Sequence, residues 1–310
     1  MNISKTLKVG VFAAVSTLAL QSPASAEAIK IAVNEWTGQH ISAHFAGQLF
    51  EKLGHDVEYV TAGAVPQFAA LAEGSIHIQP EVWTNNVGDI YPKAVESGDI
   101  LVVGGLGLEP REGWIYPPYM EEQCPGLPAY EALYDCAQAF AAADTFPDGR
   151  LITYPADWGT RSSDLVKAID IPLKPIPGGS EGAMLAELKS AVAAEQPILM
   201  MMWAPHWVHA DIEMNWVSWD TPEGECDEGA QTRGSACGFA QAAVEKVVSK
   251  GFAESFPDAM KLVEQMSLSN DIQNGLILEI DQNNRDVAEV VAEWLDANKG
   301  VWEPWMAASK

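Results

Sequence analysis

Short apolar segments alternate with amphipathic segments from residue 28 onward, and this alternation limits the chain to an α/β fold. Ile29–Val33, Val57–Val60 and Ser75–Gln79 predict strands, and the segments 41–53 and 66–72 between them predict helices. Strands joined by helices form a parallel sheet with right-handed crossovers. Ligands of such sheets bind outside the carboxyl ends of the strands.

A stretch rich in glycine and proline, 101–118, separates this unit from a second one and predicts a crossing between lobes. Further strands are expected at 151–154, 173–176 and 198–202, with helices at 164–169 and 183–194. The chain is expected to cross back near 206–211, and helices are expected at 240–249 and 287–296. We therefore predict a discontinuous first lobe (27–107 and 209–310) and a second lobe (108–208).

The first 26 residues have the pattern of an export signal. Lys5 and Lys8 precede an apolar run at 9–20, and the small residues 24–26 form a cleavage site of the A-x-A type. Cleavage after Ala26 would place the mature protein in the periplasm. No later segment is apolar for long enough to insert into a membrane.

The formal net charge of −25 argues against nucleic acid and anionic membranes as partners. An acidic surface is compatible with a cationic ligand, and solubility alone would also account for it.

Four cysteines occur as two close pairs, Cys124 with Cys136 and Cys226 with Cys237. An even number of cysteines in an exported chain indicates disulfides. The alternative is a zinc site, which usually contains a C-x-x-C spacing that this chain lacks.

Four of the eleven tryptophans share an unusual placement. Trp36, Trp83, Trp158 and Trp203 come at or just past the ends of predicted strands, where they face the loops. Four indole faces around one point would form a cage for a quaternary ammonium group, each contact contributing about 0.5–2 kcal/mol. The alternative is that these rings fill the core between the lobes.

Several short motifs resemble one family. The segment from Met202 to Trp207 (M-W-A-P-H-W), the segments 34–36 (N-E-W) and 81–83 (E-V-W), and the stretch from Tyr116 to Tyr119 (Y-P-P-Y) resemble the binding proteins for glycine betaine, choline and related solutes. The resemblance implies a two-lobed periplasmic binding protein of type II. It implies a monomer that closes on its ligand, needs no cofactor or metal, and delivers the ligand to an ABC permease.

The resemblance also implies site residues. It gives Trp36, Trp83 and Trp203 a place in the aromatic cage, although Met202 stands where the family has glycine. The segment 127–136 is most similar to the trimethylamine N-oxide-binding members from marine bacteria, which implies that Glu131 meets the N-oxide oxygen. Tyr119 is a further expected ligand contact.

The residues alone leave three methylated amines open. Glycine betaine needs donors for its carboxylate, choline needs an acceptor for its hydroxyl, and trimethylamine N-oxide needs a donor for its oxygen. A glutamate suits choline, and a protonated glutamate suits the N-oxide. The resemblance favours the N-oxide.

A serine hydrolase is the alternative from another class of function. Gly178 to Gly182 matches the G-x-S-x-G pattern around Ser180, but prolines interrupt the preceding segment where a nucleophile elbow requires a strand. An N-cap role for Ser180 explains the pattern better.

Two weaker metal patterns have simpler explanations. His206 and His209 with Asp211 are spaced like ligands, but the P-H-W context indicates a structural histidine near the hinge. The oxygen-rich loop is a conceivable calcium site, although a solvated acidic loop is the commoner case; it contains Glu223, Glu225, Asp227 and Glu228.

Overall fold

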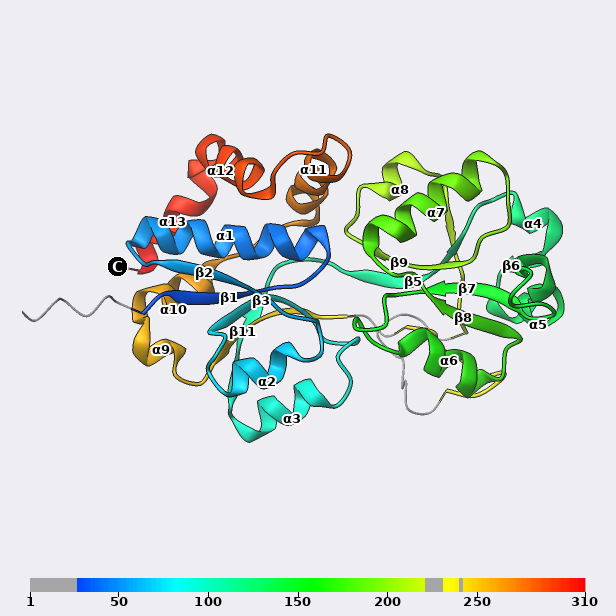
Figure 1. The fold of residues 1–310 in the computed structure, drawn as a ribbon, viewed down its shortest axis with the longest axis horizontal. Coiled ribbons are helices and arrows are strands. Elements are labelled where there is room, and N and C mark those ends of the chain that lie inside the picture. The colour runs from blue at the N-terminus through cyan, green and yellow to red at the C-terminus, as the bar shows by residue number, and fades with distance from the viewer. Residues whose placement is uncertain (1–26, 221–230, 240–241, 310) are drawn as a thin grey trace, which may run out of the picture.

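The computed structural model describes residues 27–220, 231–239 and 242–309. These residues form two α/β lobes that lie side by side, each built around a five-stranded sheet (Figure 1). The predicted export signal, with its cleavage site after Ala26, lies outside the described residues.

The first lobe contains a mixed sheet in the order β2-β1-β3-β11-β4. The strands are β1 (Ile29–Val33), β2 (Val57–Thr61), β3 (Ile78–Trp83), β4 (Ile100–Gly105) and β11 (Val244–Ser249). β1 pairs in parallel with β2 and β3, whereas β11 lies antiparallel between β3 and β4. The predicted parallel unit is thus present and is extended by a strand from the distant C-terminal part of the chain.

Helices cover both faces of this sheet (Figure 1). One face carries α1, whose Ile41, Phe45 and Leu49 are fully buried and which ends where Gly54 turns left-handed with φ of 100°. The other face carries α2 and α3. The helices of this lobe are α1 (Thr37–Leu53), α2 (Gln67–Ala72), α3 (Ile90–Ser97), α9 (Phe252–Ser255), α10 (Pro257–Gln265), α11 (Asn270–Asp281), α12 (Val287–Ala297) and α13 (Lys299–Ser309).

The second lobe contains a sheet in the order β10-β5-β9-β7-β8. Its strands are β5 (Arg111–Tyr116), β7 (Gly149–Thr153), β8 (Leu173–Pro177), β9 (Met200–Ala204) and β10 (Asn215–Trp216), and β6 (Pro125–Pro128) lies apart. Its α-helices are α4 (Met120–Gln123), α5 (Leu133–Cys136), α6 (Arg161–Ile169), α7 (Glu181–Ala193) and α8 (Val208–Asp211), with short 3-10 turns at Tyr130–Ala132 and Ala137–Phe140. A disulfide joins Cys124 to Cys136, as predicted, at a Cα separation of 5.2 Å.

Two sequence-based expectations differ from this architecture. The helix predicted at 240–249 is wrong, because Val244–Ser249 is the strand β11, and its buried valines fit a strand enclosed between two neighbours. The second sheet also continues past residue 208, since Trp216 of β10 pairs with Ile115 of β5. The chain therefore crosses back after β10 and not at 206–211.

Candidate ligand-binding site

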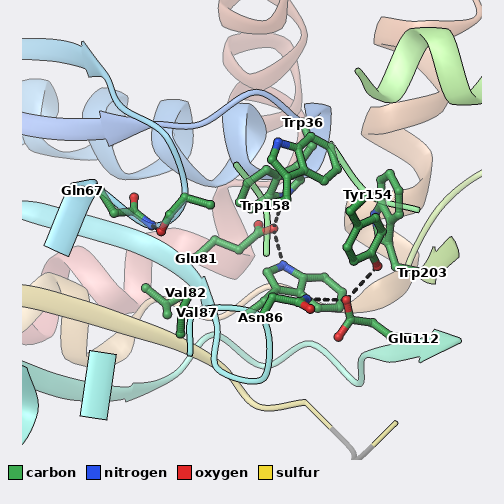
Figure 2. Close-up of a pocket in the computed structure, with 12 residues that line it drawn as sticks. Trp36, Gln67, Glu81, Val82, Asn86, Val87, Glu112, Tyr154, Trp158 and Trp203 are labelled. Atoms are coloured by element: carbon green, nitrogen blue, oxygen red, sulfur yellow. Dashed lines mark hydrogen bonds between the residues drawn. The ribbon is translucent and has the colours of Figure 1, made fainter. Parts of the chain in front are cut away.

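A small cavity of about 40 Å³ lies where the two lobes meet. All four predicted cage tryptophans line it: Trp36 and Trp83 from the first lobe, and Trp158 and Trp203 from the second. Figure 2 shows Trp36, Trp158 and Trp203 around the cavity. Trp36 immediately precedes α1, and Trp83 is the last residue of β3. Trp158 lies in the loop after β7, and Trp203 lies near the end of β9. The strand ends of both sheets thus point their indoles at one place.

The rings form a nearly closed aromatic wall. Trp36 and Trp158 meet across the lobes with ring centroids 5.1 Å apart and an interplanar angle of 62°. Trp158 contacts Trp203 at 5.6 Å and 74°, and Tyr154 contacts both of these rings at 5.7 and 5.5 Å. All four tryptophans are between 5% and 8% exposed. Edge-to-face pairs of this kind are individually favourable and fix the orientation of each ring.

Glu81 of β3 orients two of the indoles. Its Oε1 accepts hydrogen bonds from Nε1 of Trp36 at 2.9 Å and from Nε1 of Trp83 at 3.0 Å. Ser42 and Gln273 donate to its other oxygen at 2.5 and 2.8 Å. The carboxylate is 1% exposed and lines the cavity beside the two indoles, so its charge favours a cation at the ring faces.

A second carboxylate, Glu112 of β5, lines the opposite wall of the cavity (Figure 2). Tyr154 donates its hydroxyl to Glu112 Oε1 at 2.7 Å, and the side-chain amides of Asn85 and Asn86 donate to the two carboxylate oxygens. Burial raises the pKa of Glu112, and the hydrogen bonds from Tyr154, Asn86 and Asn85 together with the nearby charge of Arg161 oppose that rise. A protonated form of Glu112 is therefore accessible at higher pH than for a carboxyl in water.

Strand register places Glu112 against the cage. Glu112 lies directly opposite Trp203 in the antiparallel pair of β5 and β9. The acid that lines the cavity comes from β5, within the glycine- and proline-rich stretch 101–118, and not from the segment 127–136.

Glu131 and Tyr119, both expected at the ligand, are not among the residues that line the cavity. Glu131 is exposed, beside Asp220, in a 3-10 turn that leads into α5 at the outer end of the second lobe (Figure 1). Tyr119 precedes α4, and its hydroxyl donates to the backbone oxygen of Gln196 at 2.7 Å. The carboxyls that line the cavity are Glu81 and Glu112.

Sequence reasoning missed Glu112, Tyr154, Asn86 and Gln67 as lining residues. No local signal singles out Glu112, since Glu109 of the same glycine-rich stretch is exposed.

The remaining candidate residues have structural roles or lie outside the residues that the structure describes. Ser180 N-caps α7 by accepting from the backbone N–H of Ala183 at 3.2 Å. His209 lies 2.7 Å from the backbone oxygen of Trp203, while His206 pairs with Glu181 and not with Asp211. Cys226 and the acidic loop with Glu223, Glu225, Asp227 and Glu228 lie outside the described residues. In the described part of the chain, no helix has the length and apolarity needed to cross a membrane.

Comparison with known proteins shows the family of the chain. The sequence profile of the substrate-binding domain of ABC-type glycine betaine transport systems matches residues 27–297. The chain belongs to this family. A trimethylamine N-oxide-binding protein of Pelagibacter ubique (strain HTCC1062) is 26% identical over 290 residues, which is 91% of each chain.

Solved structures share the two-lobed fold. Lactococcal OpuAC in its closed-liganded conformation with glycine betaine superimposes with a TM-score of 0.73 at 18% identity, over 90% of this chain and 99% of that one. An ABC-transporter choline-binding protein in complex with choline gives a TM-score of 0.76 at 18% identity, over 92% and 93% of the two chains. The α/β fold with two lobes and two five-stranded sheets is therefore that of a periplasmic binding protein.

Proposed function

We propose that this chain is the periplasmic receptor of an ABC importer and binds trimethylamine N-oxide in the tryptophan cage. The observation that carries the proposal is the meeting of four indoles from both lobes at one small cavity whose ionisable lining groups are Glu81, Glu112 and Tyr154. Such a cavity attracts a methylated, electron-poor head group, and none of its lining residues is a Lys, Arg or His that could pair with a carboxylate ligand.

The trimethylated nitrogen would occupy the centre of the cage. Its methyl groups would lie against the faces of Trp36, Trp158 and Trp203, each contact contributing about 0.5–2 kcal/mol once water is excluded. Glu81 holds Trp36 and Trp83 by their N–H groups, so these donors are occupied and the ring faces stay available to the ligand.

The polar end of the ligand would be satisfied by donors at the second wall. The protonated Glu112 would donate to the N-oxide oxygen, and the raised pKa of this buried carboxyl favours that form. Trp158 offers a second donor, because its buried Nε1 has no hydrogen-bond partner among the described residues. An orphaned buried donor at a cavity is a natural partner for a ligand oxygen.

Two alternative ligands fit this lining less well. Glycine betaine would bring a carboxylate against Glu81 and Glu112, and none of the lining residues is Lys, Arg or His. Choline would find an acceptor in ionised Glu112, but its hydroxyethyl arm needs more room than the compact N-oxide.

Binding would work by closure. A monomeric receptor samples open and closed arrangements, and a ligand that contacts both lobes favours the closed one. Because cage residues come from both lobes, each half alone would hold the ligand poorly. The closed receptor would then dock on its permease partner and release the solute.

Calorimetry of the mature protein against trimethylamine N-oxide, choline, glycine betaine and carnitine tests this function. We expect the tightest binding with the N-oxide. Tightest binding to choline or betaine would change the identity of the proposed ligand but leave the proposed receptor function intact. No heat with any of the four would overturn the proposed function.

A further inference from the structure

A buried polar cluster joins the two lobes outside the ligand cavity. Thr37, at the start of α1, and Asp281, at the end of α11, belong to the first lobe. Glu181, at the start of α7, and His206, just after β9, belong to the second. None of these four residues lines the cavity, yet Thr37 directly follows Trp36 and His206 contacts the ring of Trp203 at 5.3 Å.

The contacts across the lobes are short. The backbone N–H of Thr37 donates to Glu181 Oε2 at 2.8 Å, and Trp207 Nε1 donates to Asp281 Oδ2 at 2.8 Å. The Thr37 N–H is one of the unpaired donors of the first helical turn, so a residue of the other lobe satisfies the N-terminus of α1. Separation of the lobes would break both bonds.

The hydroxyl of Thr37 lies between two carboxyl groups. Thr37 Oγ1 lies 3.0 Å from Glu181 Oε2 and 2.7 Å from Asp281 Oδ1, both hydrogen-bonding distances. One hydroxyl carries one proton, so it donates to only one of the two carboxylates. The other contact is a hydrogen bond only when that carboxyl carries a proton of its own.

The imidazole of His206 is not the source of a hydrogen bond to Asp281. His206 Nδ1 accepts from the backbone N–H of Val208 at 3.1 Å, so His206 Nε2 carries the hydrogen and faces Glu181 Oε1 at 3.2 Å. Asp281 Oδ2 is 4.0 Å from the same nitrogen.

The same geometry disfavours a metal ion, although the ligand atoms of Glu181, His206 and Asp281 lie within 4.8 Å of one another. A metal on His206 Nε2 would require a hydrogen on Nδ1, which would then point at the Val208 N–H.

Asp281 is the group best placed to hold the extra proton. Burial and the nearby Glu181 raise the pKa of Asp281. It also ends α11, where the helix dipole disfavours a negative charge.

We propose that Thr37, Asp281, Glu181 and His206 form a proton-linked latch, which takes up a proton at Asp281 as the lobes close and thereby sets ligand affinity from outside the cavity. This inference rests on closure between the lobes and not on which amine is bound.

The surrounding ionisable groups have other partners. Asp211 accepts from Gln282 at 3.4 Å, and Lys189 lies 4.5 Å from the ring centre of Trp207. The rings of His40 and His209 bond to backbone oxygens of Asn34 and Trp203. None of these contacts neutralises Asp281.

Two substitutions that keep the side-chain shape test the effect of the proton in the cluster. Asp281→Asn places an amide where the proton would be: its N–H donates to Thr37 Oγ1 while its oxygen accepts from Trp207. Glu181→Gln should lose a hydrogen bond in either orientation of the new side chain, because its NH2 group then faces the N–H of Thr37 or that of His206. Asp258→Asn is the matched control, since Asp258 pairs with His55 at 3.0 Å within the first lobe.

The first test is calorimetry with whichever methylated amine binds, in buffers of different ionisation enthalpy. We expect wild type to take up protons on binding and to weaken as pH rises. Asp281→Asn should take up fewer protons, and near pH 8.5 it should bind about tenfold more tightly than wild type, within the usual range of coupling energies. Glu181→Gln should bind about tenfold more weakly, and Asp258→Asn should match wild type. Equal proton uptake in wild type and Asp281→Asn would overturn the latch.

The second test needs no ligand and so separates failure of the latch from failure of the proposed function. Spin labels at Glu96 on α3 and Lys167 on α6, both exposed, report the distance between the lobes. We expect the short-distance population of wild type to grow as pH falls from about 8.5 to about 6, and that of Asp281→Asn to stay constant. An identical pH response in the two proteins would refute the proposal.

Discussion

Replacement of Trp158 by alanine is the sharpest single perturbation of the cage. Trp158 contacts Trp36 across the lobes at 5.1 Å and also touches Trp203 and Tyr154. The change removes one indole face from the ligand and one aromatic contact from the closed state. Replacing a residue that contacts both the ligand and the other lobe should weaken binding more than replacing a residue that only packs within one lobe.

The expected magnitude follows from these two contacts. A desolvated cation–π contact contributes about 0.5–2 kcal/mol, and an aromatic pair contributes about 0.5–1.5 kcal/mol. Trp158→Ala should therefore cost about 1–3.5 kcal/mol, or roughly 5- to 300-fold in Kd. Trp158→Phe keeps a smaller ring and should fall between wild type and alanine.

The assay is calorimetric titration with trimethylamine N-oxide, with thermal unfolding to show that each variant is folded. Trp305→Ala is the control, because Trp305 lies half-buried on α13 and packs within the first lobe. It should lower Tm and leave Kd unchanged. A folded Trp158→Ala protein with a Kd within about twofold of wild type would refute the cage.

Four further predictions address other parts of the site and fold. Because burial raises the pKa of Glu112 and the N-oxide needs a donor, the affinity of wild type relative to Glu112→Gln should fall as pH rises from about 6 to about 9 in calorimetry, and a rise would indicate choline. Glu81→Gln should weaken binding about 5- to 100-fold, since it removes the negative charge that lines the cage, and an unchanged Kd would exclude that role. Ser180→Ala should lose about 1 kcal/mol of stability in denaturant unfolding with no change in Kd, and loss of an esterase activity would instead revive the hydrolase reading. Replacing Cys124 and Cys136 by serine should cost about 3 kcal/mol of unfolding free energy and leave binding intact, whereas equal stability would show that the bond adds nothing.

Periodicity predicted the parts of the fold that depend on local pattern. The segments that became β1, α1, β2 and β9 each show a clear strand or helix period, and the structure has them where expected. The helix prediction for 240–249 was wrong because a run of small residues and valines fits both the helix and the strand period. Only pairing with the two neighbouring strands makes β11 a strand. Likewise, nothing local marks β10 as a partner of β5, so the return crossing was placed too early.

The tryptophans of the site were predictable because parallel strands end at one edge and the indoles follow those ends. Glu112 was not, because its approach to Trp203 depends on the antiparallel register of β5 and β9, which are far apart in sequence. Glu131 was chosen by similarity of a segment and not by a contact, and that segment lies at the outer end of the second lobe.

A crystal structure of the mature protein with trimethylamine N-oxide tests the central claim most directly. We predict the ligand nitrogen within about 6 Å of the ring centres of Trp36, Trp83, Trp158 and Trp203, with the oxygen directed at Glu112. A ligand bound elsewhere, or one enclosed by the tryptophans of a single lobe, would contradict the account.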